Sequence, residues 1–260
     1  KAARAILTTD LTPKCVSLRT RIDGRNVTLA GIAKGSGMIE PNMATMLSFL
    51  ITDAAIAPPL LRKLLRAAAD ESYNRVTVDG ETSTSDTVFL LANGCAGNAL
   101  LRDAASAGAR RFAGALGEVT QELARAIARD GEGATKLVTV RVSGAKRADD
   151  ALRAARRIAN SMLVKTALFG GDPNWGRILQ TAGAARVAIA LDRAEVRLGG
   201  VAVFRNGSPT GAAARRRAGR ALARKEVDVE LDLGVGRHAA TVWTCDLSYD
   251  YVEINAEYTT

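Results

Sequence analysis

The sequence predicts an α+β fold, a layered sandwich of sheets and helices. Strand-like runs alternate with amphipathic helical runs, the helices do not recur at the spacing of βαβ units, and 47% of the residues are hydrophobic. This apolar content is enough for a full core, and the irregular alternation favours a layered sandwich over a doubly wound sheet. The 260 residues contain no low-complexity linker and no repeat, so no clear domain boundary is predicted.

The first elements are a hairpin, a strand and a helix. Residues 16–33 read as two short strands around Asp23-Gly24, a dipeptide that favours a two-residue turn. Residues 46–56 predict a buried strand. Residues 58–72 predict a helix, because prolines occupy its first positions and leucines recur at helical spacing.

The rest of the chain continues the alternation. Its predicted elements, in order, are a strand at 85–93, a helix at 117–130, a strand at 136–144, one long helix at 148–164, a short helix after Asn174, a strand at 186–192, a hairpin at 196–204 closed by Asn206-Gly207, a basic helix at 211–225, strands at 226–234 and 238–248, and a last strand at 251–256.

Cysteine usage and hydropathy restrict the class of protein. The three cysteines, Cys15, Cys95 and Cys245, are odd in number and lack metal-ligand spacing, which argues against a disulfide framework or a zinc site. No apolar run is long enough for a membrane span, and no signal peptide is evident. A soluble, cytoplasmic protein without a metal or a membrane partner is therefore expected.

The net charge of +9 raises the question of nucleic-acid binding. The excess comes from arginines spread over alanine-rich helices such as 211–225, and only 4% of the residues are aromatic. We interpret these basic faces as solvent-exposed and expect no nucleic-acid partner, although the charge favours anionic small substrates. A nucleic-acid-binding protein is the alternative from another class, and it predicts binding that weakens steeply with salt.

The residues around Thr45 form the first candidate site. Gly35 and the Pro41-Asn42 pair predict a tight turn before it. A threonine at a strand start commonly has no chemical role, and its hydroxyl needs an adjacent base to act as a nucleophile. If the bond between Ala44 and Thr45 were cut, the new α-amine would lie beside the hydroxyl and could take its proton, since the pKa of an α-amine in an unstructured peptide is about 8.

Two later segments carry more polar groups than ordinary turns need. Residues 130–136, DGEGATK, place Glu132 between two glycines, where a carboxylate could meet a ligand ammonium. The second segment is one polar loop whose hydrogen-bonding residues are Asp79, Glu81, Thr82, Ser83, Thr84, Ser85 and Asp86. Taken alone, each segment also fits an ordinary loop.

The segment FGGDPNWGR, residues 169–177, places Asp172, Asn174 and Trp175 at a helix start. An Asp or Asn N-cap and a packing tryptophan explain these residues adequately. The single histidine, His238, lies near a strand start and is expected to be structural.

Taken together, five motifs resemble, in the same order, the bacterial glutamate N-acetyltransferase family, also called ornithine acetyltransferase. They are KGSGMIEPNMATML, NRVTVDGETSTSDT, DGEGATK, KTALFGGDPNWGR and the terminal YVEINAEYTT. The resemblance runs from LTTDLTPK at residue 7 to the last residue. It implies an α+β sandwich of the N-terminal-nucleophile-like type that D-aminopeptidase relatives share.

The resemblance also implies a self-cleaving precursor. Cleavage between Ala44 and Thr45 would leave residues 1–44 as the end of an α chain and 45–260 as a β chain, and the two would assemble as a dimer of αβ units. Family members carry an upstream Thr-Gly pair that forms the oxyanion hole, so further sequence before residue 1 is expected. Loss of such donors typically costs about 10²–10³ in rate.

The implied reaction is ping-pong acetyl transfer in arginine biosynthesis. Thr45 takes the acetyl group from N-acetylornithine, releases ornithine and passes the acetyl group to glutamate. Some members also use acetyl-CoA as a donor substrate, and no resident cofactor is implied. Carried over by motif, Thr45 is catalytic, and the substrate-binding residues are Lys34, Thr45, Glu132, Asn255 and Thr260.

An amidase or aminopeptidase of the same fold, with water as the acceptor, is the alternative enzyme. Lys34 suits a carboxylate and Glu132 suits an ammonium. With Asn255 they form a set that fits a zwitterionic amino acid, which disfavours the amidase.

Overall fold

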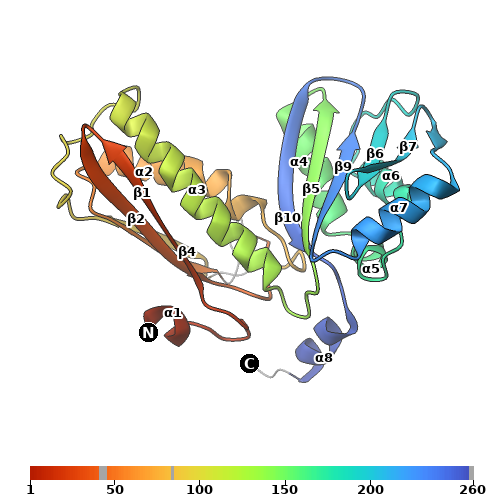
Figure 1. The fold of residues 1–260 in the computed structure, drawn as a ribbon, viewed down its shortest axis with the longest axis horizontal. Helices are drawn as coiled ribbons and strands as arrows, with labels where there is room; N and C mark the ends of the chain where they lie inside the picture. Colours follow the sequence, from red (N-terminus) through yellow and green to blue (C-terminus); the bar gives the residue numbers. More distant parts are fainter. Residues whose placement is uncertain (41–45, 83–84, 258–260) are drawn as a thin grey trace. The chain divides into compact units, whose positions relative to one another are not determined.

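The structure is a computed structural model that describes residues 1–40, 46–82 and 85–257. The chain divides into two compact units, Lys1–Val76 with Glu81–Asp130 and Thr77–Gly80 with Gly131–Thr260 (Figure 1). The expectation of no clear domain boundary is therefore wrong. Composition gave no signal because the chain crosses between units in short turns, such as the one after Asp130, and not in a linker.

The first unit is built on a mixed sheet of strand order β1-β2-β3-β4. Its strands are β1 (Lys14–Ile22), β2 (Arg25–Lys34), β3 (Leu47–Thr52) and β4 (Thr87–Ala92). β1 and β2 form the predicted hairpin, whose turn residues Asp23 and Gly24 have φ angles of 50° and 77°. β3 pairs antiparallel with β2 and parallel with β4.

Helices pack on this sheet and on one another. They are α1 (Ala2–Ala5), α2 (Pro58–Asp70), the 3₁₀ turn η1 (Tyr73–Arg75) and α3 (Ala107–Arg129). α3 packs on β1 and β2, and α2 packs on α3. α3 begins earlier than predicted because Ser106 caps it, its Oγ accepting a hydrogen bond from the Ala109 N–H at 3.2 Å.

The strand predicted at 46–56 is shorter than expected and buried on one face only. Leu50 is fully buried, whereas its neighbour Ile51 is 56% exposed. Successive side chains of a strand point to opposite faces, so the outward side chains of β3 lie on the face that is not buried within the unit.

The second unit is built on a sheet of strand order β10-β5-β9-β6-β7-β8. Its strands are β5 (Leu137–Ala145), β6 (Glu195–Leu198), β7 (Val201–Arg205), β8 (Ser208–Pro209), β9 (Glu226–Asp232) and β10 (His238–Cys245). β5 and β9 are parallel and all other pairs are antiparallel. Mixed sheets joined by hairpins and helices confirm the α+β class.

Five helices complete the described part of this unit. They are α4 (Ala148–Ala159), α5 (Met162–Phe169), α6 (Trp175–Ala184), α7 (Ala212–Leu222) and α8 (Tyr249–Glu257). α4 packs on β10 and β5, and its buried alanines and Ile158 belong to the same core cluster as the buried valines of β5 and β9. α7, the predicted basic helix, packs on β6 and β7.

The long helix predicted at 148–164 is in fact two helices. α4 ends at its C-cap Asn160, and Ser161 caps α5 by accepting a hydrogen bond from the Val164 N–H at 3.4 Å. Asn160 also accepts a hydrogen bond from the Thr77 hydroxyl at 2.6 Å. Asn and Ser favour helix ends because their side chains bond to nearby polar groups, and periodicity alone does not show such a break.

Three strand predictions near the C-terminal end need correction. Residues 186–192 form no strand, because β6 takes the place beside β9. In the hairpin at 196–204, Gly199 and Gly200 form the turn, and Asn206-Gly207 instead joins β7 to β8.

Residues 251–256 belong to a helix, α8, and not to a last strand. The Ser248 hydroxyl accepts a hydrogen bond from the Asp250 N–H at 3.2 Å at the start of α8, and a short apolar run does not distinguish strand from helix.

Candidate functional site

Part of the predicted site falls outside the described residues. These positions are Ala44, Thr45 and Thr260, together with Ser83 and Thr84 of the polar loop. Lys34, Glu132 and Asn255 are described. Lys34 belongs to the first unit, whereas Glu132 and Asn255 belong to the second.

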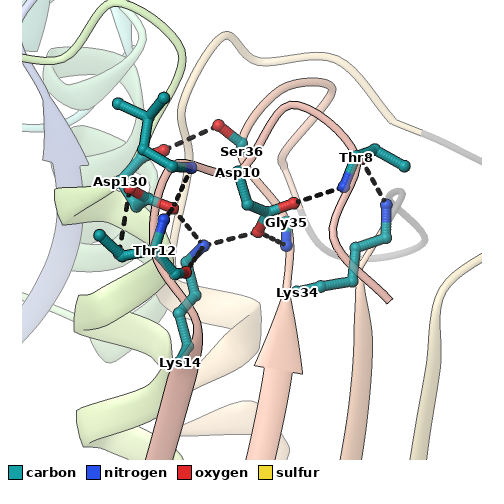
Figure 2. Close-up of polar contacts among 9 residues, drawn as sticks. Thr8, Asp10, Thr12, Lys14, Lys34, Gly35, Ser36 and Asp130 are labelled. Carbon is teal, nitrogen blue, oxygen red and sulfur yellow. Dashed lines mark hydrogen bonds and ion pairs between the residues drawn. The ribbon is translucent and has the colours of Figure 1, made fainter. Parts of the chain in front are cut away.

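Lys34 ends β2 and is only 7% exposed. Its ammonium donates a hydrogen bond to the Thr8 hydroxyl at 3.2 Å (Figure 2). An ammonium has three N–H donors, so Thr8 leaves capacity for a ligand oxygen. Thr8 is not among the residues predicted for the site, although it lies in the LTTDLTPK run where the resemblance begins.

A buried ionic network holds the chain beside Lys34 (Figure 2). The Lys14 ammonium lies 2.6 Å from the Asp10 carboxylate and 2.5 Å from the Asp130 carboxylate, and all three side chains are at most 8% exposed. Asp10 also accepts a hydrogen bond from the Gly35 N–H at 2.8 Å, and Ser36 donates to the Asp130 carbonyl at 2.7 Å. The network therefore fixes the Gly35-Ser36 turn that follows Lys34.

Electrostatics within this network favour the charged forms. Burial alone would raise the pKa of the Asp10 carboxyl, but hydrogen bonds from the Gly35 N–H and from Lys14 hold that pKa below its usual value. The network was not foreseen from the sequence. Nothing in local periodicity connects Asp10 and Lys14 with Asp130, which lies more than a hundred residues further along the chain.

Asp86 is the member of the predicted polar loop that approaches the candidate site in the first unit. Its carboxylate accepts a hydrogen bond from the Met46 N–H at 2.6 Å. Burial raises the pKa of Asp86 to about 6, although the Met46 bond and the Lys34 charge lower it. Asp79 belongs to the second unit, where its carboxylate accepts a hydrogen bond from the Tyr251 hydroxyl at 3.3 Å.

Glu132 and Asn255 meet in the second unit. The Asn255 amide donates to the Glu132 carboxylate at 2.9 Å and to the Tyr251 carbonyl at 3.0 Å, one turn back in α8. Glu132 is half-buried, and Asn255 is exposed. The structure therefore brings together two residues that are far apart in the sequence and that the family resemblance had named.

The FGGDPNWGR segment has the predicted packing role. Asn174 caps α6, its side chain accepting from the Arg177 N–H at 3.1 Å, and its amide donates to Asp172 at 2.9 Å. Trp175 stacks on Phe204 with ring centroids 4.9 Å apart. These contacts agree with the capping and packing roles expected for the segment.

The single histidine and the three cysteines differ in their exposure. His238 is exposed at the first position of β10, and Cys245 is buried whereas Cys15 and Cys95 are exposed. In the described part of the chain, no three His, Cys, Asp or Glu side chains cluster as a metal site would require. Among the described helices, none has the length and hydropathy of a membrane span.

Fold and site together define the class: an α+β protein built of two sheet-and-helix units, with a cationic and an anionic group on separate elements. Comparison with known proteins narrows this class. The family model described as the ArgJ family matches residues 1–260. The chain belongs to the ArgJ family.

Relatives of this family are similar to the chain over nearly its whole length. The arginine biosynthesis bifunctional protein ArgJ of Listeria monocytogenes is 49% identical over 98% of this chain and 64% of that protein. The protein of the same name from Symbiobacterium thermophilum is 51% identical over 100% of this chain and 64% of that protein. The chain thus spans less than two thirds of the length of these relatives.

A solved structure shows the same fold. The crystal structure of arginine biosynthesis bifunctional protein argJ from Bacillus halodurans superposes with a TM-score of 0.78 at 40% sequence identity. The match covers 82% of this chain and 100% of the solved chain.

Proposed function

We propose that this protein is a cytoplasmic acetyltransferase of arginine biosynthesis, which moves the acetyl group of N-acetylornithine to glutamate. The pathway is supported by the relatives, whose names include arginine biosynthesis. The substrates are small charged amino acids, and the reaction requires no resident cofactor, no metal and no nucleic-acid partner.

The observation that carries the proposal is the pair of Glu132 and Asn255. A carboxylate accepts up to about four hydrogen bonds, so the 2.9 Å bond from Asn255 orients Glu132 and leaves capacity for a substrate ammonium. Ornithine and glutamate each carry an ammonium. An oriented, half-buried carboxylate on a rigid turn is suited to binding that group.

Lys34 supplies the opposite charge. Its nearly buried ammonium is held by Thr8 at 3.2 Å and would bind a substrate carboxylate, a group that N-acetylornithine and glutamate share. A buried cation discriminates strongly for an anion, because leaving it unpaired is unfavourable. Thr260, at the end of the chain, is proposed as a further binding residue by resemblance.

Thr45 is proposed as both the cleavage nucleophile and the catalytic nucleophile. After cleavage from Ala44, its α-amine takes the proton of its own hydroxyl as the oxygen attacks the acetyl carbonyl. Ornithine leaves with a proton on its α-amine, and an acetyl ester remains on Thr45. The α-amine of glutamate then attacks this ester and regenerates the free threonine.

The sheet topology is compatible with cleavage at this bond. β1 and β2 precede Thr45, whereas β3 and β4 follow it, and β2 pairs with β3 from Lys34–Leu47 to Leu29–Thr52. The two products would therefore remain joined by a shared sheet, which supports an assembly of α and β chains.

Intact mass spectrometry tests the cleavage. Under denaturing conditions we expect two species, the larger beginning at Thr45, and under native conditions one species that contains both. A single uncut chain in active protein would contradict the role of Thr45.

An acetyl-transfer assay tests the reaction. Purified protein with N-acetylornithine and glutamate should form N-acetylglutamate, and Glu132→Gln should raise KM by about tenfold or more through loss of one charged hydrogen bond. Glu118→Gln, on the exposed side of α3, is the matched control and should behave as wild type. Accumulation of acetate without N-acetylglutamate would instead support the amidase.

Acetyl-CoA is proposed as a second donor because the relatives are named bifunctional. Replacing N-acetylornithine by acetyl-CoA should release free CoA thiol in step with N-acetylglutamate. If protein that is active with N-acetylornithine releases no thiol, the reaction is restricted to acetyl transfer from N-acetylornithine.

A further inference from the structure

The Glu132 turn, residues 131–136, is held in place by a buried carboxylate that lies in none of the sequence motifs. Asp246 is 1% exposed and follows β10 directly. Its Oδ1 accepts hydrogen bonds from the backbone N–H groups of Thr135 at 2.8 Å and Lys136 at 2.9 Å, and its Oδ2 accepts from the Thr135 hydroxyl. Three donors on one buried carboxylate satisfy it and fix the segment that supplies them.

The residues after Asp246 hold the same turn at two further points. The Ser248 hydroxyl donates to the Gly133 carbonyl at 2.6 Å, and Asn255 of α8 reaches Glu132. α8 passes so close that a Cβ on Gly133 would lie 2.4 Å from the Tyr251 nitrogen. The Glu132 turn and the start of α8 are therefore packed against each other, and Asp246 anchors the end of the turn that leads into β5.

Two lysine side chains fix the chain on either side of this contact between Asp246 and the turn. Lys165, 3% exposed, donates to the Cys245 carbonyl at 2.5 Å and to the Thr244 hydroxyl at 3.0 Å, which fixes the strand end next to Asp246. Lys136 donates to the Phe169 carbonyl at 3.1 Å. Burial lowers the pKa of Lys136, and the charge of Asp246 opposes this change.

We propose that Asp246 is the positioning residue for Glu132. By holding Thr135 and Lys136, it sets where the Glu132 carboxylate lies relative to Asn255, and therefore how well the pair binds a substrate ammonium. Asp246 touches no substrate and acts only through the turn. The inference rests on the proposed role of Glu132 as the ammonium ligand.

Binding of ornithine by the full protein is the first measurement. Asp246→Ala should weaken binding about tenfold or more and should raise KM with little change in kcat, because a misplaced ligand group loses binding before it alters the chemistry at Thr45. Asp232→Ala is the matched control, since Asp232 ends β9 of the same sheet and accepts from the Gly234 N–H at 2.8 Å. It should bind ornithine as wild type does.

Two further variants separate positioning from general structure. Asp246→Asn keeps an oxygen acceptor for both backbone N–H groups and should recover most of the affinity. The double variant Glu132→Gln with Asp246→Ala should bind no more weakly than Glu132→Gln alone, because both changes act through one carboxylate. Additive losses, or wild-type affinity in Asp246→Ala, would overturn the proposal.

Hydrogen exchange tests the proposal without any substrate. The amides of Thr135 and Lys136 should exchange faster in Asp246→Ala while those of β5 and β9 stay protected. Unchanged protection at both amides would also overturn it, and if Asp246→Ala unfolds, the comparison with Asp246→Asn decides. Failure of the wild type to bind ornithine would contradict the proposed function, whereas the exchange result still bears on Asp246 alone.

Discussion

Lys34 and Glu132 are held in different ways in the two units. The turn after Lys34 is fixed by a buried ionic network of Asp10, Lys14 and Asp130. The turn that carries Glu132 is fixed by Asp246, which accepts hydrogen bonds from the backbone N–H groups of Thr135 and Lys136, and by Ser248, whose hydroxyl donates to the Gly133 carbonyl. The turn after Lys34 depends on mutual compensation of buried charges, whereas the turn that carries Glu132 depends on several separate hydrogen bonds.

The difference predicts how each support fails. Removing one member of a buried ionic network leaves uncompensated charge in a site of low dielectric, so the loss is large and affects the whole unit. Removing one hydrogen bond from a turn held at three points costs less and affects mainly the position of the turn. Variants whose effects reverse this order would contradict the distinction between the two supports.

The largest effect is expected at Lys14. Lys14→Met leaves the buried carboxylates of Asp10 and Asp130 without their shared cation, and we expect a loss of about 3–5 kcal/mol in the free energy of unfolding. Denaturant unfolding measures this. Lys63→Met, the same change at an exposed position of α2, is the control and should stay within about 0.5 kcal/mol of wild type. Equal effects of the two variants would show that the buried network adds no special stability.

A smaller effect is expected at Gly133. Gly133 has a φ of 66°, and an added Cβ would lie 2.4 Å from the Tyr251 nitrogen. Gly133→Ala should therefore lower the free energy of unfolding by about 1–3 kcal/mol and weaken ornithine binding. Gly114→Ala, within α3 and with open space around it, should instead stabilise by about 0.5–1 kcal/mol. Thermal unfolding and calorimetric titration compare them, and a neutral Gly133→Ala would show that α8 is not packed on this turn.

The smallest effect is expected at Asp86 and depends on pH. Because its pKa is raised from 3.8 to about 6, its contribution to stability is present below pH 4 and is lost as pH rises through 6. Asp86→Asn keeps a neutral acceptor for the Met46 N–H at every pH. The free energy of unfolding of this variant, relative to that of wild type, should therefore rise on the order of 1–2 kcal/mol between pH 4 and pH 7. Unfolding curves at both pH values measure this gain.

Asp192→Asn, at an exposed position, is the control for Asp86 and should keep the wild-type pH dependence. A constant difference between Asp86→Asn and wild type across this range would mean that the Asp86 carboxyl is not held in a desolvated site.

Much of the fold could be predicted because its signals are local. The Asp23-Gly24 turn, the prolines at the start of α2 and the Asn174 cap of α6 each act within a few residues, and each is in place. The errors lie where distant contacts decide. Residues 186–192 resemble a strand, but the edge of β9 is already paired, and residues 251–256 form a helix that packs on the Glu132 turn.

The candidate site divides in the same way. Lys34, Glu132 and Asn255 could be named from the sequence through the family motifs, whereas the residues that support them could not. Asp246 bonds to residues more than a hundred positions away, and Lys14 meets Asp130 across a similar separation. No periodicity or spacing in a single sequence encodes such contacts.

The sequence by itself determined the α+β class, most of the helices and strands, and the charged residues proposed for the site, because turn chemistry, apolar period and motif order act along the chain. Only the tertiary structure decided the two-unit division, the break between α4 and α5, the helical state of α8 and the buried carboxylates behind Lys34 and Glu132. The physical reason is that burial and charge compensation depend on which distant segments the fold brings together.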